Sequence, residues 1–139
     1  MRDIMNHVHI TPAFAPKAAV TDDTAQVSTV ADLKGFGSAM LGFITGTDAD
    51  ADATFTVLVE DSADNAAWAA VADEYLNGTE ALAGYTFADD NECRKIGYHG
   101  IKRYVRATIT PANNTGNVFI GGFWVLGHPS RQATANPPA

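Results

Sequence analysis

The chain has 139 residues, with 9 Lys and Arg against 16 Asp and Glu, and a formal net charge of −7 at pH 7. This length suits one domain, the acidic total argues against a protein held to DNA by phosphate neutralisation, and no apolar stretch approaches the ~20 residues that span a bilayer. Ala supplies 24 residues and Leu only 6, whereas Val, Ile and Thr supply 31, which favours short strands over a helical bundle.

The first 16 residues are predicted to form an extended N-terminal arm. Residues 1–10 contain neither a continuous apolar core nor a small-residue cleavage site, so we do not expect a signal peptide. Pro12 and Pro16 then interrupt any regular element. The arm is too apolar for a solvated tail, and we expect it to pack on its own domain or on a neighbour. Its apolar side chains are Ile4, Met5, Val8, Ile10 and Phe14.

Strand candidates then recur along residues 17–128, with turn residues between them. Residues 53–60 and 103–110 alternate between apolar and polar side chains, as half-buried strands do. Residues 117–126 are apolar on both sides, which suits a central strand or one covered on both faces. Further strands are expected within residues 25–33, 38–45, 83–87 and 93–98, short strand or irregular structure within 66–75, and a hairpin turn over 111–116.

About eight short strands at this spacing predict an all-β protein, an antiparallel β-sandwich of jelly-roll-like or Ig-like type. The sandwich is expected to span residues 17–128, between the N-terminal arm and a flexible C-terminal tail over residues 129–139. The tail is rich in Pro, Ala and Asn, as flexible or extended termini often are.

Charge is distributed in two blocks along the chain. Residues 35–93 carry twelve acids and no Lys or Arg, whereas residues 94–139 carry six basic residues and no acid. An acidic strand and a basic strand could therefore lie side by side and compensate each other. Alternatively, the two blocks could form a bipolar surface that meets complementary patches on neighbouring subunits. On the basic stretch, Lys102, Arg103 and Arg106 are the residues we expect to make such contacts.

Chemistry-bearing motifs are sparse. Asp48, Asp50 and Asp52 are weak metal candidates, because calcium loops begin with oxygen ligands at alternate positions. Ala53 stands where such a loop needs Gly, and Val59 stands where it needs a bidentate Glu, so we expect no bound metal. The sequence contains no phosphate-binding Gly-x-x-x-x-Gly-Lys, no Gly-x-Ser-x-Gly and no His-Glu-x-x-His. We therefore expect no catalytic residues and no cofactor, and hence no enzyme.

One ordered set of motifs resembles a known group of proteins. Thr54-Phe-Thr-Val-Leu-Val-Glu60 and Trp68 are followed by Gly97-Tyr-His-Gly-Ile-Lys-Arg-Tyr-Val-Arg106 and then by Thr110-Pro-Ala-Asn-Asn-Thr-Gly116. Over residues 1–128 this order resembles small structural proteins found among the head genes of tailed bacteriophages and of phage-derived gene transfer agents. Such proteins are similar to capsid decoration or cement proteins, which are β-rich and sit on the shell between capsomers.

The resemblance implies a structural virion protein that decorates the capsid surface and stabilises the head shell. Its partners would be the major capsid protein and other copies of itself, in a homo-trimer or another ring, with no membrane and no direct contact with nucleic acid. Assembly would take place in the host bacterial cytoplasm. The arm and the basic stretch would carry the contacts.

Two other functions stay open at this point. The protein could be a head spike or tail component of the virion. It could also be a carbohydrate-binding β-sandwich module displayed on the virion, because Trp68 and Trp124 could stack on sugar rings. Exposed, coplanar aromatic rings would favour the carbohydrate-binding function, and buried tryptophans would oppose it.

Overall fold

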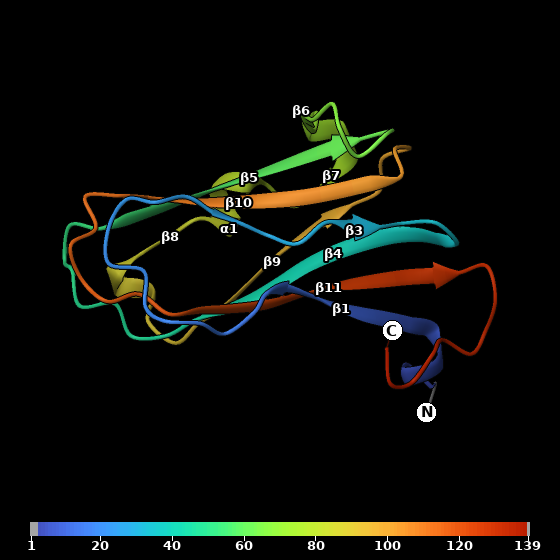
Figure 1. The fold of residues 1–139 in the computed structure, drawn as a ribbon, viewed down its shortest axis with the longest axis horizontal. Coiled ribbons are helices and arrows are strands. Elements are labelled where there is room, and N and C mark those ends of the chain that lie inside the picture. Colours follow the sequence, from blue (N-terminus) through green and yellow to red (C-terminus); the bar gives the residue numbers. More distant parts are fainter. Residues whose placement is uncertain (1–2, 139) are drawn as a thin grey trace.

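The computed structural model describes residues 3–138 and shows two antiparallel β-sheets packed face to face (Figure 1). In spatial order, the five-stranded sheet contains β1 (Val8–Phe14), β11 (Ile120–Pro129), β4 (Phe36–Thr45), β9 (Cys93–Tyr98) and β7 (Leu76–Asn77). The six-stranded sheet contains β2 (Gln26–Val27), β10 (Tyr104–Ala112), β5 (Thr54–Ser62) and β6 (Ala69–Ala70), with β3 (Ala31–Asp32) paired to β10 and β8 (Tyr85–Thr86) paired to β5. The predicted antiparallel β-sandwich is confirmed.

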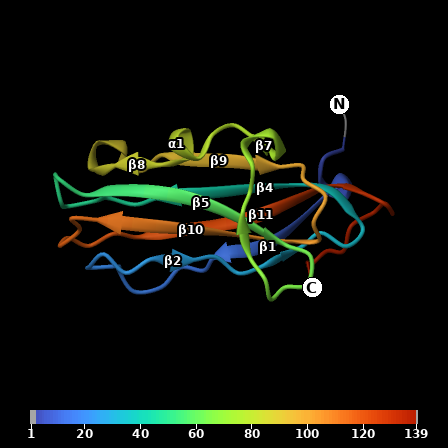
Figure 2. The same cartoon turned by 90° about the horizontal axis from the view of Figure 1, so that it is seen from above.

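Among the residues that the structure describes, helical structure is confined to short turns before β1 and between the strands. These are the 3-10 turns η1 (Met5–His7), η2 (Asp73–Tyr75) and η3 (Phe87–Asp89) and the single turn α1 (Glu80–Ala83). Figure 2 shows α1, β7 and β8 along the same edge of the sandwich as β9. Within residues 3–138, no helix is both long enough and apolar enough to cross a membrane.

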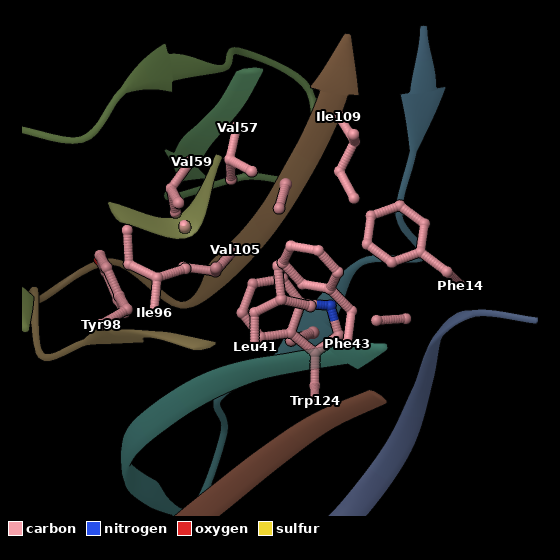
Figure 3. Packing of buried hydrophobic residues seen from close by; sticks show 14 of the residues in the cluster. Phe14, Leu41, Phe43, Val57, Val59, Ile96, Tyr98, Val105, Ile109 and Trp124 are labelled. Atoms are coloured by element: carbon pink, nitrogen blue, oxygen red, sulfur yellow. The ribbon is translucent and has the colours of Figure 1, made fainter. Parts of the chain in front are cut away.

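The core lies between the two sheets. Its residues on β5 and β10 are the apolar ones of the alternating apolar and polar pattern in the sequence. On β5, Phe55, Val57 and Val59 are buried, while Thr54 and Thr56 face solvent. On β10, Val105, Ala107 and Ile109 are completely buried. From the five-stranded sheet, side chains that include Leu41, Phe43, Ile96 and Trp124 meet them across the sandwich (Figure 3).

Strand β11 lies between β1 and β4, which confirms the central position predicted from its apolar character. Trp124 and Leu126 point into the core and are 1% and 2% exposed. The indole Nε1 of Trp124 donates a hydrogen bond to the carbonyl oxygen of Thr29 at 3.1 Å, so this large ring is buried without an unpaired donor.

The predicted N-terminal arm differs from the structure over residues 8–14. These residues form β1, which pairs antiparallel with β11 at one edge of the five-stranded sheet. Pro12 interrupts a helix or a central strand, but it is tolerated in an edge strand, where no second neighbour needs its N–H. Phe14 lies in the core and is 8% exposed, so of the two expected positions for the arm it takes the one on its own domain.

Two other sequence-based boundaries also need correction. Residues 111–116 do not close a hairpin, because β10 runs to Ala112 and residues 113–119 connect it to β11 in the other sheet. The C-terminal segment folds back onto the N-terminal turn, where the hydroxyl of Thr134 donates to the carbonyl oxygens of Met5 and Val8 at 3.2 and 2.6 Å. The residues predicted as a flexible tail therefore contact the first strand.

Replacing Ile109 with Ala should strongly destabilise the sandwich, because it removes side-chain volume from the fully buried centre of β10. The free energy of unfolding should fall by about 2–5 kcal/mol in urea denaturation. Thr110→Ala, on the exposed side of the same strand, should change it by less than about 0.5 kcal/mol. Equal effects of the two substitutions would contradict this placement of the core.

Candidate interaction surface

Acidic side chains of the same chain bind the three residues of the basic stretch that were expected at an interface, Lys102, Arg103 and Arg106. Arg106 on β10 lies directly opposite Glu60 on β5, with Arg106 Nε 2.8 Å from a Glu60 carboxylate oxygen. The guanidinium carbon of Arg106 also lies 4.4 Å from the centre of the Trp68 ring, in a cation–π contact. Arg103 binds Asp32 through two hydrogen bonds of 2.7 and 2.6 Å. Of the two interpretations of the charge blocks, the Arg106–Glu60 pair supports compensation between neighbouring strands, whereas Asp32 lies outside the acidic block of residues 35–93.

Lys102 takes part in a hydrogen-bonded cluster around the buried carboxylate of Asp61. Lys102 Nζ lies 2.7 Å from Asp61 Oδ1, and the hydroxyl of Tyr98 donates to Asp61 Oδ2 at 3.0 Å. The same hydroxyl accepts the backbone N–H of Lys102 at 3.1 Å. Tyr98 lies on β9 and Asp61 on β5, so this cluster connects the two sheets.

The glycine between Tyr98 and Lys102 is required by this cluster. A Cβ atom at Gly100 would lie only 2.4 Å from the Tyr98 hydroxyl oxygen, well inside van der Waals contact. The connection can therefore fold over the tyrosine ring only without a side chain at this position. The motif Gly97-Tyr-His-Gly-Ile-Lys-Arg, which carried the sequence resemblance, holds the sandwich together at this end.

These contacts change the set of residues expected at an interface. Lys102, Arg103 and Arg106 have acidic partners within the chain, and Phe14 is in the core, so none of the four is a freely available contact. Val8 and Ile10 alternate with core-facing residues of β1 and lie on the outer side of the five-stranded sheet.

Ile4 and Met5 remain as apolar side chains of the N-terminal segment with large exposure, 73% and 58%. Ile101, in the connection between β9 and β10, is 93% exposed. Both views place η1 and the β9–β10 connection at the same end of the sandwich, with η1 beside β1 of one sheet and the connection beside β10 of the other (Figures 1 and 2). We call Ile4, Met5 and Ile101 the apolar end. An isolated Ile between Gly100 and Lys102 gives no periodic signal, so only the fold reveals that it is exposed.

Two of the three aspartates singled out as metal candidates, Asp48 and Asp50, stabilise a loop. Asp48 accepts the backbone N–H of Asp50, and Asp50 Oδ2 accepts the N–H and hydroxyl of Thr115, both at 2.7 Å. The hydrogen bonds from Thr115 lower the pKa of Asp50 to about 2, and the hydrogen bond shared with Asp50 raises the pKa of Asp52. Over residues 3–138, no three His, Cys, Asp or Glu side chains form a group that could hold a metal ion.

The two tryptophans do not form a shared aromatic surface. Trp124 is buried in the core and Trp68 is half-buried in contact with the guanidinium of Arg106. Sugar-binding sandwiches need exposed rings that can stack on a pyranose. The arrangement predicted for carbohydrate binding through Trp68 and Trp124 is therefore absent from the described part of the chain.

No protein-family model matches this sequence, and no curated protein matches it. Among solved structures, the PBSX exported protein XepA is similar, with a TM-score of 0.56 and 14% identity over 98% of this chain and 42% of that chain. The C-terminal family 22 carbohydrate-binding module of Clostridium thermocellum Xyn10B gives a TM-score of 0.48 at 8% identity, over 91% of this chain and 97% of that one. The SPBc2 prophage-derived protein YomS gives 0.43 at 10% identity, over 85% and 92%. This chain thus spans less than half of XepA, and its likeness to XepA supports the β-sandwich fold.

Tyr98→Phe should weaken the contact between the sheets, because it leaves one oxygen of the buried Asp61 carboxylate without its donor. Hydrogen bonds to charged groups contribute about 1.5–3 kcal/mol, and we expect the free energy of unfolding to fall by that amount in urea. Tyr104→Phe is the matched control, since its ring is only half-buried on β10, and it should leave the stability nearly unchanged. A Tyr98→Phe protein as stable as the wild type would show that the cluster contributes nothing.

The same cluster should make the protein sensitive to alkaline pH. Burial raises the pKa of Tyr98 to about 12, and the hydrogen bond to Asp61 adds to the rise. An unfolded tyrosine titrates near pH ~10, so the stabilisation of the neutral phenol is complete below pH ~10 and is lost as the pH rises towards about 12. Tyr85 is also buried, and burial raises its pKa as well. Thermal melting between pH 9 and pH 12 should therefore show a decline in stability that is shallower in Tyr98→Phe; identical slopes would contradict this expectation.

Proposed function

We propose that this chain is a structural, non-enzymatic virion protein that decorates the head shell of a tailed phage and binds the major capsid protein. The observation that carries the proposal is the apolar end of the sandwich, where Ile4, Met5 and Ile101 are largely exposed. Exposed apolar side chains contribute favourable free energy to binding when a partner covers them, at about 25 cal/mol per Å² of buried apolar surface.

Two further observations support this proposal. The sequence motifs resemble head proteins of tailed phages, and the resemblance implies a β-rich fold such as the sandwich found here. The chain also uses its most prominent polar side chains for its own stability, because the clustered basic residues bind Asp32, Glu60 and Asp61. This leaves the apolar surfaces as the most distinctive features available to a partner.

A head spike or tail component would use the same sandwich and the same apolar end in another place on the particle. Cryo-electron microscopy of the particle distinguishes these positions, because decoration proteins lie on the shell between capsomers. Density for this fold only at the tail or at a vertex spike would replace the proposed position.

The proposal is tested by co-sedimentation with purified empty head shells of the phage or gene transfer agent that encodes the chain. Ile4→Ser combined with Met5→Ser should raise the dissociation constant at least about tenfold, since each 1.4 kcal/mol of lost burial corresponds to a factor of ten. Leu82→Ser is the matched control, because Leu82 is 73% exposed, like Ile4, but lies on α1.

Circular dichroism should first show that both proteins are folded. Failure of the wild-type chain to bind shells would overturn the proposal. Equal binding by the double variant would remove the apolar end from the interface.

A further inference from the structure

The outer face of the five-stranded sheet is apolar, and apart from η1 and the C-terminal segment at the start of β1 no other layer of the sandwich lies on it. Its side chains come from the residues that alternate with the core-facing positions of β1, β11, β4 and β9. Ile10, Ile44 and Phe123 are 45%, 50% and 49% exposed. In Figure 1 this face points away from β5 and β10. The outward positions on which the argument rests are Pro12, Gly121, Phe123, Gly42, Ile44 and Lys95.

The other sheet has a different outer face. On β5 and β10 the outward positions include Thr56, Thr108 and Thr110, together with the Glu60–Arg106 ion pair. The large exposed apolar side chains of this face are Leu58 on β5 and Val27 on the short strand β2. An antiparallel sheet with one face in water normally has this polar outer surface. The five-stranded sheet instead has the composition of a sheet that is covered on both sides.

We propose that a second copy of this chain covers this face, so that two five-stranded sheets pack against each other in a symmetric dimer. The inference concerns self-association and goes beyond the proposed attachment to a shell. It also replaces the trimer or ring expected from the sequence with a closed pair, because a face that binds its own copy about a twofold axis is saturated at two subunits.

Charge favours a second copy at this face. The chain carries a net charge of −7, so two copies repel each other at most orientations. The outward positions of this face include Lys95 but no Asp or Glu. Pairing through this face therefore brings the two chains together where neither presents a carboxylate.

The area of this face is also compatible with an interface to a second copy. Strands are ~4.8 Å apart and rise ~3.3 Å per residue, so β1, β11, β4 and β9, with seven, ten, ten and six residues, present about 520 Å² in projection. A stable interface buries about 800 Å² of accessible surface on each partner, and a corrugated face has more accessible surface than its projection. Two sheets with the same right-handed twist also match each other in shape when their strands are nearly aligned.

The arrangement of large and small residues suggests where the twofold axis lies. An axis parallel to the strands, between β11 and β4, places each β11 over the partner's β4. Ile44 then faces the partner's Gly121, where the nearest atom to an added Cβ would be the Pro16 ring at 4.0 Å. Phe123, whose ring lies across Gly42, comes close to the axis and to its own copy. Lys95, at the β9 side, faces the partner's Pro12 at the rim and not a second Lys95.

Sedimentation equilibrium of the full chain, without shells, tests this inference. The wild type should be a dimer at micromolar concentration. Ile44→Asp should raise the dimer dissociation constant by about 100-fold or more, because the twofold axis makes each substitution count twice. Leu58→Asp places the same charge on the outer side of β5, where Leu58 is 39% exposed, and should leave the dimer intact.

A monomer at 100 µM, a trimer, or equal effects of the two substitutions would overturn the inference. A monomeric wild type that loses shell binding through Ile44→Asp would show that the capsid protein is the occupant of this face. Because oligomeric state is measured in the absence of shells, failure of the dimer leaves the proposed attachment at the apolar end to be judged by its own assay.

Discussion

The buried carboxylate of Asp61 is the charge around which one end of the sandwich is built. A carboxylate that is 6% exposed costs several kcal/mol unless donors replace the water it has lost. Tyr98 supplies one donor from the opposite sheet and Lys102 supplies another from the connection that follows. This requirement determines the position of the Tyr98 ring, and the ring in turn requires glycine at position 100. The polar contact between the two layers and the path of the β9–β10 connection therefore have one cause.

Pairing of charges within the chain also explains why the outer faces of the two sheets differ. The acidic and basic blocks of the sequence lie on neighbouring strands, so Glu60 and Arg106 neutralise each other on the outer side of the six-stranded sheet. The five-stranded sheet has no such pair in its outward rows and presents Phe123 and Ile44 in their place. A sandwich needs only one apolar side of each sheet for its core. The second apolar side is thus unnecessary for folding the single chain, and association is the physical use that it suits.

Local alternation predicted a large part of the fold but could not predict strand partners. Cys93–Tyr98 and the inward residues of β5 and β10 agree with the sequence pattern, because alternation is a property of one strand. The edge strand β1 was missed because its pairing with β11 spans most of the chain and Pro12 resembles a strand breaker. For the same reason Lys102 and Arg103 were expected at an interface. Their acidic partners depend on register and on the course of a connection, which the residue pattern does not determine.

The direction of the strands determines how the apolar end and the outer face of the five-stranded sheet can act together in the proposed dimer. Rotation about an axis parallel to the strands leaves strand direction unchanged, so both copies of the proposed dimer carry Ile4, Met5 and Ile101 at the same end. A single shell surface could then hold both copies at once. The second contact becomes intramolecular after the first has formed, so its effective concentration is far above that of free protein. Two small apolar ends, each weak alone, would hold the dimer on a shell, whereas an axis perpendicular to the strands would point one end away from it. The direction of the twofold axis therefore decides whether pairing through the sheet strengthens attachment through the end.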